Sequence, residues 1–431
     1  MKNFKLIISS LIVVFFSCSP DDSDSPSPED VFVKYFGVSG DQAAIDLIYN
    51  EALDQYFILG SQTLTGGNAD FYYATASASG NIINQRTYNH LDSSLIDIPS
   101  AIKPLTESSY LVVGTSSNTD DDSKIVWGVI DHDLNTEATY YELSNPIDEE
   151  QDLVAADIVK IEGEDNVLIF GTTSVIYPGD QANEETAGKQ LFIAKVTLTN
   201  EVIWKKTSGG VSDDIAVKAF ELSNGGFGLF GRTERAEDNY SGTNVLVKFT
   251  NSLGTEDGTD AAYGFDSNLS NDDILMDVIK VGNDFKLTGT SSANGANPSA
   301  FVMGISSTGI RDTTVMKATT LSNDFGSNIN TSANTIVRAN NGDYMIMGSF
   351  PNFQTGDGSR LEEMMILRTD ANGNKIDDKD QWYGLESGND RANKAISLSD
   401  GKIAVLGTFD FGSGITLIGL LKLNINGELK R

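Results

Sequence analysis

The chain has 431 residues and a formal net charge of −31, from 30 Lys and Arg against 61 Asp and Glu. Such a surface repels phosphate backbones and anionic headgroups, which argues against nucleic-acid binding. The single Cys excludes a disulfide framework. Because the chain has only two His, a His-based metal site or a Ser-His-Asp triad would each depend on one imidazole.

Residues 1–17 have the layout of a secretory signal peptide. Lys2 and Lys5 precede an apolar run from Leu6 to Phe16 that is too short for a membrane-spanning helix. The end of the apolar run, Ser17 and Cys18 together resemble the lipobox of bacterial lipoproteins, which implies acylation of Cys18. The match is imperfect, because Phe15 and Phe16 stand where Leu and a small residue are usual. The alternative is a chance Cys beside an ordinary cleavage site.

Residues 18–30 predict an acidic tether rich in Ser and Pro, because they cannot bury apolar area. The pair Asp21-Asp22 resembles the export signal of Bacteroidota lipoproteins that face outward from the cell outer membrane. The resemblance implies a protein held to the membrane by its lipid alone and exposed to the extracellular side. A polar linker without any such signal would look similar.

One unit recurs seven times from Val31 onward. Each copy has a short apolar strand that ends on a Gly, followed by Ser, Thr or Arg, and the copies are 54 to 60 residues apart. These anchor glycines are Gly60, Gly114, Gly171, Gly231, Gly289, Gly348 and Gly407. We letter the strands of a unit: A before the anchor strand, B ending on the anchor, C after a variable loop, and D after a tight turn.

Four short strands in about 58 residues are typical of a β-propeller blade, and no helix-length amphipathic segment interrupts them. The last unit ends before a full strand D, whereas residues 31–40 (VFVKYFGVSG) match a strand-D stretch, IWKKTSGGVS, starting at Ile203. We therefore predict that residues 31–431 form an all-β, seven-bladed propeller with four antiparallel strands per blade. Residues 31–40 complete the last blade beside 415–430, which closes the ring.

The B–C loops and D–A corners of such a propeller share one face, and the B–C loops vary most in length. Variable loops on a rigid scaffold commonly carry binding residues, so this face is the predicted binding face. Its candidate residues are an acidic set at the D–A corners and an aromatic set in the B–C loops: Asp41, Asp213, Asp272, Asp390, Tyr177, Tyr240, Phe350 and Phe353.

Two interpretations stay open for each set. The acids could ring the channel mouth and hold Ca²⁺, or cap backbone amides at the corners, which explains their recurrence better. The rings could stack on sugars or anchor a protein partner, or they could fold down over the blade edge. The segment from Asp370 faintly resembles a Ca²⁺ loop, but Lys375 occupies its obligatory Gly position, so no metal site is predicted.

The strand Gly225–Gly231, the Asn-Gly turns and the stretch Trp204–Asp214 resemble the propeller-repeat surface lipoproteins of Bacteroidota. The resemblance covers nearly the whole mature chain and implies a surface-exposed binding or scaffold protein. We expect a monomeric propeller that recognises a protein partner or glycan through the predicted binding face. The alternative is a carboxylate-dependent glycosidase or lyase with its site in the central funnel. Abundant acids alone do not decide between these functions.

Overall fold

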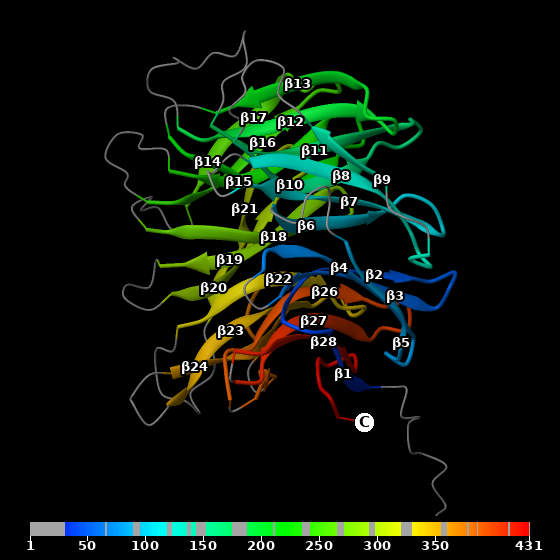
Figure 1. Cartoon of the computed structure of the whole chain (residues 1–431). Helices are drawn as coiled ribbons and strands as arrows, with labels where there is room; N and C mark the ends of the chain where they lie inside the picture. Colours follow the sequence, from blue (N-terminus) through cyan, green and yellow to red (C-terminus); the bar gives the residue numbers. More distant parts are fainter. Residues whose placement is uncertain are drawn as a thin grey trace, which may run out of the picture.

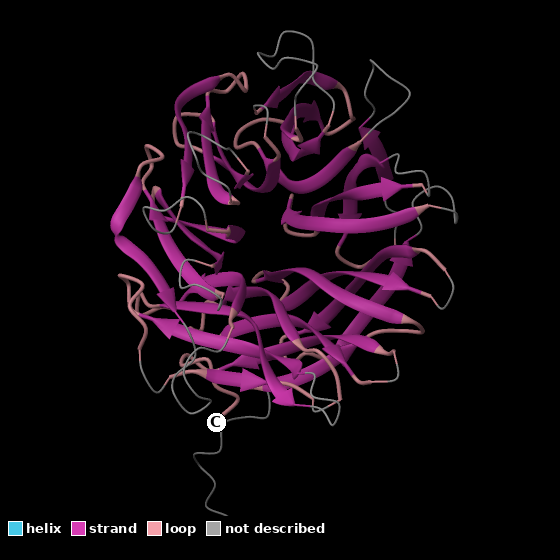
Figure 2. Cartoon of the chain, turned by 90° about the vertical axis from the view of Figure 1, so that its left-hand side faces the viewer, coloured by secondary structure: helices cyan, strands magenta, loops and turns pink. Residues whose placement is uncertain are grey.

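The computed structural model describes residues 31–64, 67–88, 95–118, 123–135, 139–143, 152–174, 188–209, 212–234, 242–264, 271–292, 298–319, 330–354, 360–376, 379–385, 387–412 and 414–430. These residues form seven four-stranded antiparallel sheets arranged around one axis (Figure 2). The predicted seven-bladed propeller is confirmed. No helix within the described ranges is long and apolar enough to cross a membrane.

Each sheet is one blade, in which strands A to D pair in that order with strand A nearest the axis; Figure 1 labels the strands. Blades 1 to 4 contain β2 (Asp41–Asn50), β3 (Gln55–Thr63), β4 (Ala69–Ser77) and β5 (Ile82–Tyr88); β6 (Ile96–Pro104), β7 (Ser109–Ser117), β8 (Ser123–Asp131) and β9 (Thr139–Leu143); β10 (Leu153–Lys160), β11 (Asn166–Thr173), β12 (Gln190–Thr197) and β13 (Val202–Ser208); and β14 (Asp214–Glu221), β15 (Phe227–Thr233), β16 (Asn244–Thr250) and β17 (Glu256–Tyr263). Blades 5 to 7 contain β18 (Asp273–Val281), β19 (Asp284–Ser291), β20 (Ser299–Ile305) and β21 (Arg311–Thr319); β22 (Ser332–Arg338), β23 (Tyr344–Gln354), β24 (Arg360–Thr369) and β25 (Gln381–Tyr383); and β26 (Arg391–Ser397), β27 (Ile403–Asp410) and β28 (Thr416–Leu423) with β1 (Phe32–Phe36).

The ring closes as predicted, because β1 is the outermost strand of blade 7. It pairs antiparallel with β28, with Phe32 opposite Lys422 and Phe36 opposite Ile418. The first and last described segments therefore belong to one sheet, and β1 gives blade 7 its fourth strand. Phe32 lies at the end of β28 that leads into the C–D turn, so the chain enters the ring on the face opposite the B–C loops.

The apolar core is divided among the seven blade interfaces. Each interface contains one cluster of buried side chains drawn from two neighbouring blades. Trp127 of blade 2, for example, packs with Phe192 of blade 3, and both are fully buried. A propeller of this length is stable because every blade buries its two faces against its neighbours.

The anchor glycines are explained by a bulge that all seven innermost strands share. The register shifts at Ala44/Asp46, Pro99/Ala101, Ala155/Asp157, Ala216/Lys218, Leu275/Asp277, Ala333/Thr335 and Ala392/Lys394, directly beside the anchor of strand B. The bulge brings a strand-A carbonyl against each anchor, so an added Cβ would lie 1.8 to 2.7 Å from that oxygen. Only Gly allows this approach.

In three blades the residue after the anchor is a Thr whose hydroxyl links neighbouring blades. Thr115 Oγ1 accepts a hydrogen bond from Ala155 N of the next blade at 3.0 Å, and Thr172 Oγ1 accepts one from Ala216 N at 2.9 Å. Thr408 Oγ1 makes the same bond to Ala44 N across the closure between blades 7 and 1.

Candidate functional site

The predicted acidic residues at the D–A corners join neighbouring blades. Asp213 Oδ1 accepts a hydrogen bond from Lys189 N at 2.8 Å, and Asp272 Oδ1 accepts one from Thr243 N at 3.0 Å. Asp41 Oδ1 accepts one from Thr416 N across the ring closure. Each donor belongs to the preceding blade at or just before its strand C, so the recurring Asp caps an amide of the neighbouring blade rather than of its own corner.

Asp390 is fully buried at the corner of blade 7. Its carboxylate accepts hydrogen bonds from the amides of Leu385 and Asp410. Burial raises the pKa of Asp390 to about 6, and the nearby charges of Asp410 and Glu363 act in the same direction. The two oxygens thus join the connection that follows blade 6 to the end of β27, so this carboxyl group stabilises the corner.

The predicted aromatic residues do not form a single surface within the described part of the chain. Phe350 is 1% exposed and packs in the core between blades 5 and 6. Phe353 pairs with Leu361 at the outer end of β23, where only the backbone is described. Tyr177 and Tyr240 lie outside the described residues. Phe411, in the B–C loop of blade 7, was also expected on this face; it is exposed and makes an edge-to-face contact at 5.1 Å with the exposed ring of Tyr35.

Six charged side chains of the innermost strands converge at the axis of the ring. This channel cluster, which motif reasoning did not identify, consists of Asp46, Lys103, Asp157, Lys218, Asp277 and Lys394. Its formal charges balance, with three carboxylates against three ammonium groups. Lys103 Nζ lies 2.9 Å from Asp157 Oδ1, and Lys394 Nζ lies 3.1 Å from Asp277 Oδ2.

The carboxylates of the channel cluster also hold blades together. Asp46 Oδ2 accepts a hydrogen bond from Ile102 N of blade 2, and Asp157 Oδ2 accepts one from Ala219 N of blade 4. Burial by itself would raise the pKa of Asp157, but the charges of Lys103 and Lys218 hold it below the ordinary value. The carboxylate therefore stays ionised at neutral pH and cannot serve as a general acid there.

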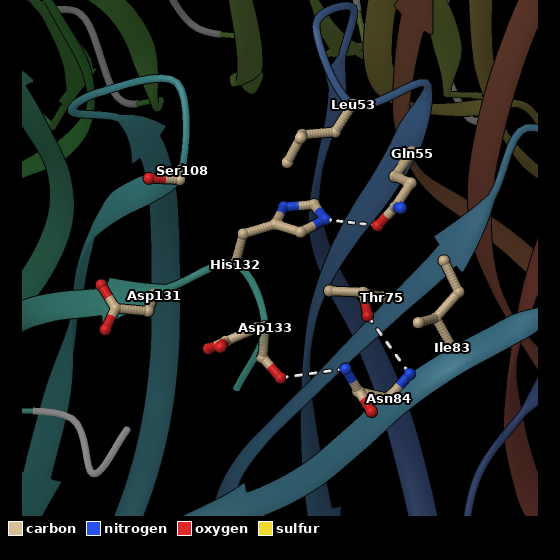
Figure 3. A pocket seen from close by; sticks show the side chains of 9 residues that line it. All are labelled: Leu53, Gln55, Thr75, Ile83, Asn84, Ser108, Asp131, His132 and Asp133. Carbon is tan, nitrogen blue, oxygen red and sulfur yellow. Dashed lines mark hydrogen bonds between the residues drawn. The ribbon is translucent and has the colours of Figure 1, made fainter. Parts of the chain in front are cut away.

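A cavity of about 540 Å³ lies between blades 1 and 2 on the face of the A–B and C–D turns (Figure 3). It is lined by Leu53, Gln55, Thr75, Ile83, Asn84, Ser108, Asp131, His132 and Asp133. Sequence reasoning placed the binding residues on the opposite face and missed this pocket. One signal was available: the turn after strand C of blade 2 has no Gly, unlike most of the other blades.

His132 forms the back of this pocket and is held by two hydrogen bonds. Its Nε2 lies 2.6 Å from Gln55 Oε1, which can only accept, so Nε2 carries the proton. Its Nδ1 accepts from the hydroxyl of Tyr110 at 2.6 Å, and that hydroxyl accepts from Asn50 Nδ2 at 2.9 Å. This chain of bonds fixes a neutral imidazole across the interface of two blades.

The stability of the protein is expected to depend on pH through His132. Burial lowers the pKa of His132, against a smaller opposing effect of the Asp133 charge. The unfolded chain, with an imidazole pKa of about 6.5, then binds more protons than the folded one, so stability falls as pH decreases below that value. Urea unfolding of His132→Asn between pH 5 and 8 should show a flatter profile than the wild type. His90→Asn is the control, and equal slopes for wild type and His132→Asn would contradict a neutral buried imidazole.

Metal-binding geometry is absent from the described residues, since no group of three or more His, Cys, Asp or Glu there could hold an ion. The hairpin at Asp370 confirms the turn interpretation of that segment: Asp370 Oδ1 accepts hydrogen bonds from Asn372 N and Asn374 N at 2.9 and 2.8 Å. Its carboxylate caps the turn of blade 6.

Comparison with known proteins shows the fold alone. No family model matches the chain, and no curated protein matches its sequence. The structure is similar to hydrazine synthase of Kuenenia stuttgartiensis, with a TM-score of 0.53 and 12% identity over 89% of this chain and 97% of that one. It also matches a Dyadobacter fermentans protein of unknown function, with a TM-score of 0.47 and 10% identity over 91% and 99%. A Penicillium chrysogenum α-L-arabinanase matches at a TM-score of 0.42 and 8% identity over 91% and 99%.

Proposed function

We propose that this propeller is a lipid-anchored binding or scaffold protein of the outer cell surface that recognises a protein partner or a glycan through its B–C and D–A face. The observation that supports this proposal best is the face of the propeller at which the chain enters β1. The tether precedes β1, whose first residue, Phe32, lies at the opposite face, beside the C–D turns. An anchor at Cys18 would thus approach from that side and leave the variable loops pointing away from the membrane.

The enzymatic alternative, a carboxylate-dependent glycosidase or lyase, has less support. Such enzymes need one carboxyl group that stays protonated at working pH and another that is free to act as base or nucleophile. In the channel cluster, burial acts to raise the pKa of Asp277, but the charges of Lys394 and Lys218 hold it below its ordinary value. Thr335 Oγ1 also donates to Asp277 Oδ2 at 2.8 Å, so this carboxylate is occupied by contacts with a neighbouring blade.

Replacement of the variable loops tests the proposal. Replacing residues 175–187 and 235–241, in the B–C loops of blades 3 and 4, by short Gly-Ser turns should abolish binding in a glycan array and in cross-linking to purified surface proteins. The fold should persist, because loop length adds little to the free energy of unfolding. Replacing the C–D turn of blade 6, residues 371–374, by Gly-Ser residues is the control on the other face.

The Cys18→Ser variant tests the lipid anchor independently of the binding face. Removing the thiol should move the protein from the membrane fraction to the soluble fraction, and protease treatment of intact cells should cut only the anchored wild type. A variant that binds normally without its B–C loops would refute the binding face. Membrane retention of Cys18→Ser would refute the anchor.

A further inference from the structure

The C–D turns of the seven blades form the rim of the face at which the chain enters β1. Each turn follows strand C, and its fourth residue donates its amide to the carbonyl of the first, as Gly80 does to Ser77. Neighbouring blades are in contact along this C–D rim. A Cβ added to Gly254 of blade 4 would lie 2.7 Å from the ring of Trp204 of blade 3, and Tyr263 of blade 4 donates its hydroxyl to the carbonyl of Gly309 of blade 5 at 2.9 Å.

Exposed aliphatic side chains gather on the C–D rim. Leu253 and Ile310 are 64% and 63% exposed, which makes them the most exposed large apolar side chains in the described part of the chain. They belong to the turns of the adjacent blades 4 and 5. Further aliphatic residues in or directly after the turns of blades 1, 3 and 7 are 42% to 47% exposed: Ile82, Ile83, Val202, Ile203 and Ile425. Polar residues are the usual choice in such turns, so the recurrence indicates a contact surface.

Three of these turns carry no charged residue. Residues 77–81, 251–255 and 306–310, in blades 1, 4 and 5, contain no Asp, Glu, Lys or Arg, in a protein with 61 acidic residues. The charged residues that follow two of them are bonded within the protein. Glu256 Oε1 accepts the hydroxyl of Ser208 and Lys248 Nζ, and Arg311 Nη1 donates to the carbonyl of Gly264 at 2.7 Å. The tips of these turns can therefore leave water without losing the hydration of a charge.

The tether keeps the C–D rim near a membrane. The chain enters blade 7 at Phe32, whose ring lies 2.4 Å from a Cβ added to Gly80 in the turn of blade 1. Residues 18–30 can span at most about 45 Å, even when fully extended. Blades 3 and 4, which carry Ile203 and Leu253, lie across the ring from blade 7 (Figure 1). A lipid on Cys18 would hold one side of the rim close to the bilayer, and the aliphatic residues across the ring are placed to hold the other side.

We propose that the C–D rim rests on the surface of a neutral lipid bilayer, with Leu253 and Ile310 inserted between the headgroups. The inference rests on the lipid anchor proposed above and adds a fixed orientation to it, in which the B–C loops face away from the membrane. The contact can be weak, because a short tether gives the rim an effective concentration on the order of millimolar. Burial of the aliphatic tips drives the contact, and the net charge of −31 disfavours an anionic surface.

Quenching by brominated lipids tests the contact. The mature chain, residues 18–431, is coupled through Cys18, its only thiol, to a maleimide-bearing phospholipid in phosphatidylcholine vesicles. Phosphatidylcholine brominated near the headgroup quenches a Trp that enters the bilayer. We expect Ile310→Trp to be quenched beyond the background of the three native Trp. Ile415→Trp is the matched control, because Ile415 is also exposed but lies in the B–C loop of blade 7, and it should add no quenching.

Removal of the aliphatic tips should release the C–D rim from the vesicle. With Ile203→Trp as the reporter, the pair Leu253→Asn and Ile310→Asn should reduce the added quenching by about half or more, because it removes the apolar area that drives insertion. The pair Val38→Asn and Ile415→Asn, on the other face, should leave it unchanged. Phosphatidylglycerol in the vesicles should weaken the quenching through charge repulsion.

The maleimide bond replaces bacterial acylation, so this result is independent of lipidation in cells, which Cys18→Ser tests separately. Equal quenching of Ile310→Trp and Ile415→Trp would overturn the proposal, as would an undiminished signal from Ile203→Trp in the Asn pair. Self-association of the uncoupled chain that Ile310→Asn abolishes, without quenching in vesicles, would identify a second copy as the occupant of the rim and would also overturn it.

Discussion

Asp157→Ala is expected to lower the free energy of unfolding by about 3 to 5 kcal/mol, because it leaves buried ammonium groups without their countercharge. Asp157 is fully buried; its carboxylate forms an ion pair with Lys103 Nζ at 2.9 Å and accepts a hydrogen bond from the amide of Ala219. The substitution therefore breaks links from blade 3 to blades 2 and 4 at once. Urea unfolding at pH 7, followed by tryptophan fluorescence, measures the change.

Two controls separate the buried charge from charge in general. Lys124→Ala breaks the half-exposed pair between Lys124 and Glu142 and should cost no more than about 1 kcal/mol. The double variant Asp157→Leu with Lys103→Met removes both charges together and should recover part of the loss. A loss below about 1 kcal/mol for Asp157→Ala would show that the channel cluster does not hold the blades together.

Because of the same carboxylates, we expect the protein to lose stability at low pH. Lysine charges hold the pKa values of Asp157 and Asp277 below the ordinary value, against the effect of burial. Their contribution is therefore complete above the unfolded-state pKa of about 3.9 and is lost as pH falls through the lower folded values. This loss comes at lower pH than the one expected from His132, so the two titrations are separable.

Gly231→Ala is expected to destabilise the protein by about 3 kcal/mol or more, the upper range for a single substitution. The new Cβ would lie 2.5 Å from the carbonyl oxygen of Ile215, which the bulge of β14 holds in place. The strain can be relieved only if the bulge opens, and this would displace Ala216 N from Thr172 Oγ1 of blade 3. Thermal and urea unfolding of the purified variant measure the loss.

Gly225→Ala in the same blade is the matched control. Gly225 has φ +78° in the A–B turn, and no atom lies within 4 Å of an added Cβ. Its replacement should cost about 1 to 2 kcal/mol from the left-handed conformation alone. If Gly231→Ala were no worse than Gly225→Ala, close approach of the backbones would not be the reason for the anchor.

The amino-acid sequence by itself determined the architecture. Seven anchor glycines at near-constant spacing, short apolar strands and turn residues are local signals, and the blades repeat them. Even ring closure was readable, because residues 31–40 match a strand D and the last unit lacks one. The innermost strand of blade 2, β6, is the one whose pattern is hardest to read, because Pro99 and Pro104 lie within it.

Tertiary structure alone decided what the recurring and the exceptional residues do. The corner residues Asp213 and Asp272 bond to a neighbouring blade, and Phe350 turns into an interface, because blade packing and not periodicity sets these contacts. The channel cluster joins charges about one or more repeats apart, and the pocket joins Gln55 of one blade to His132 of the next. Sequence patterns encode strands within a blade, whereas a site formed between blades depends on how each pair of blades packs.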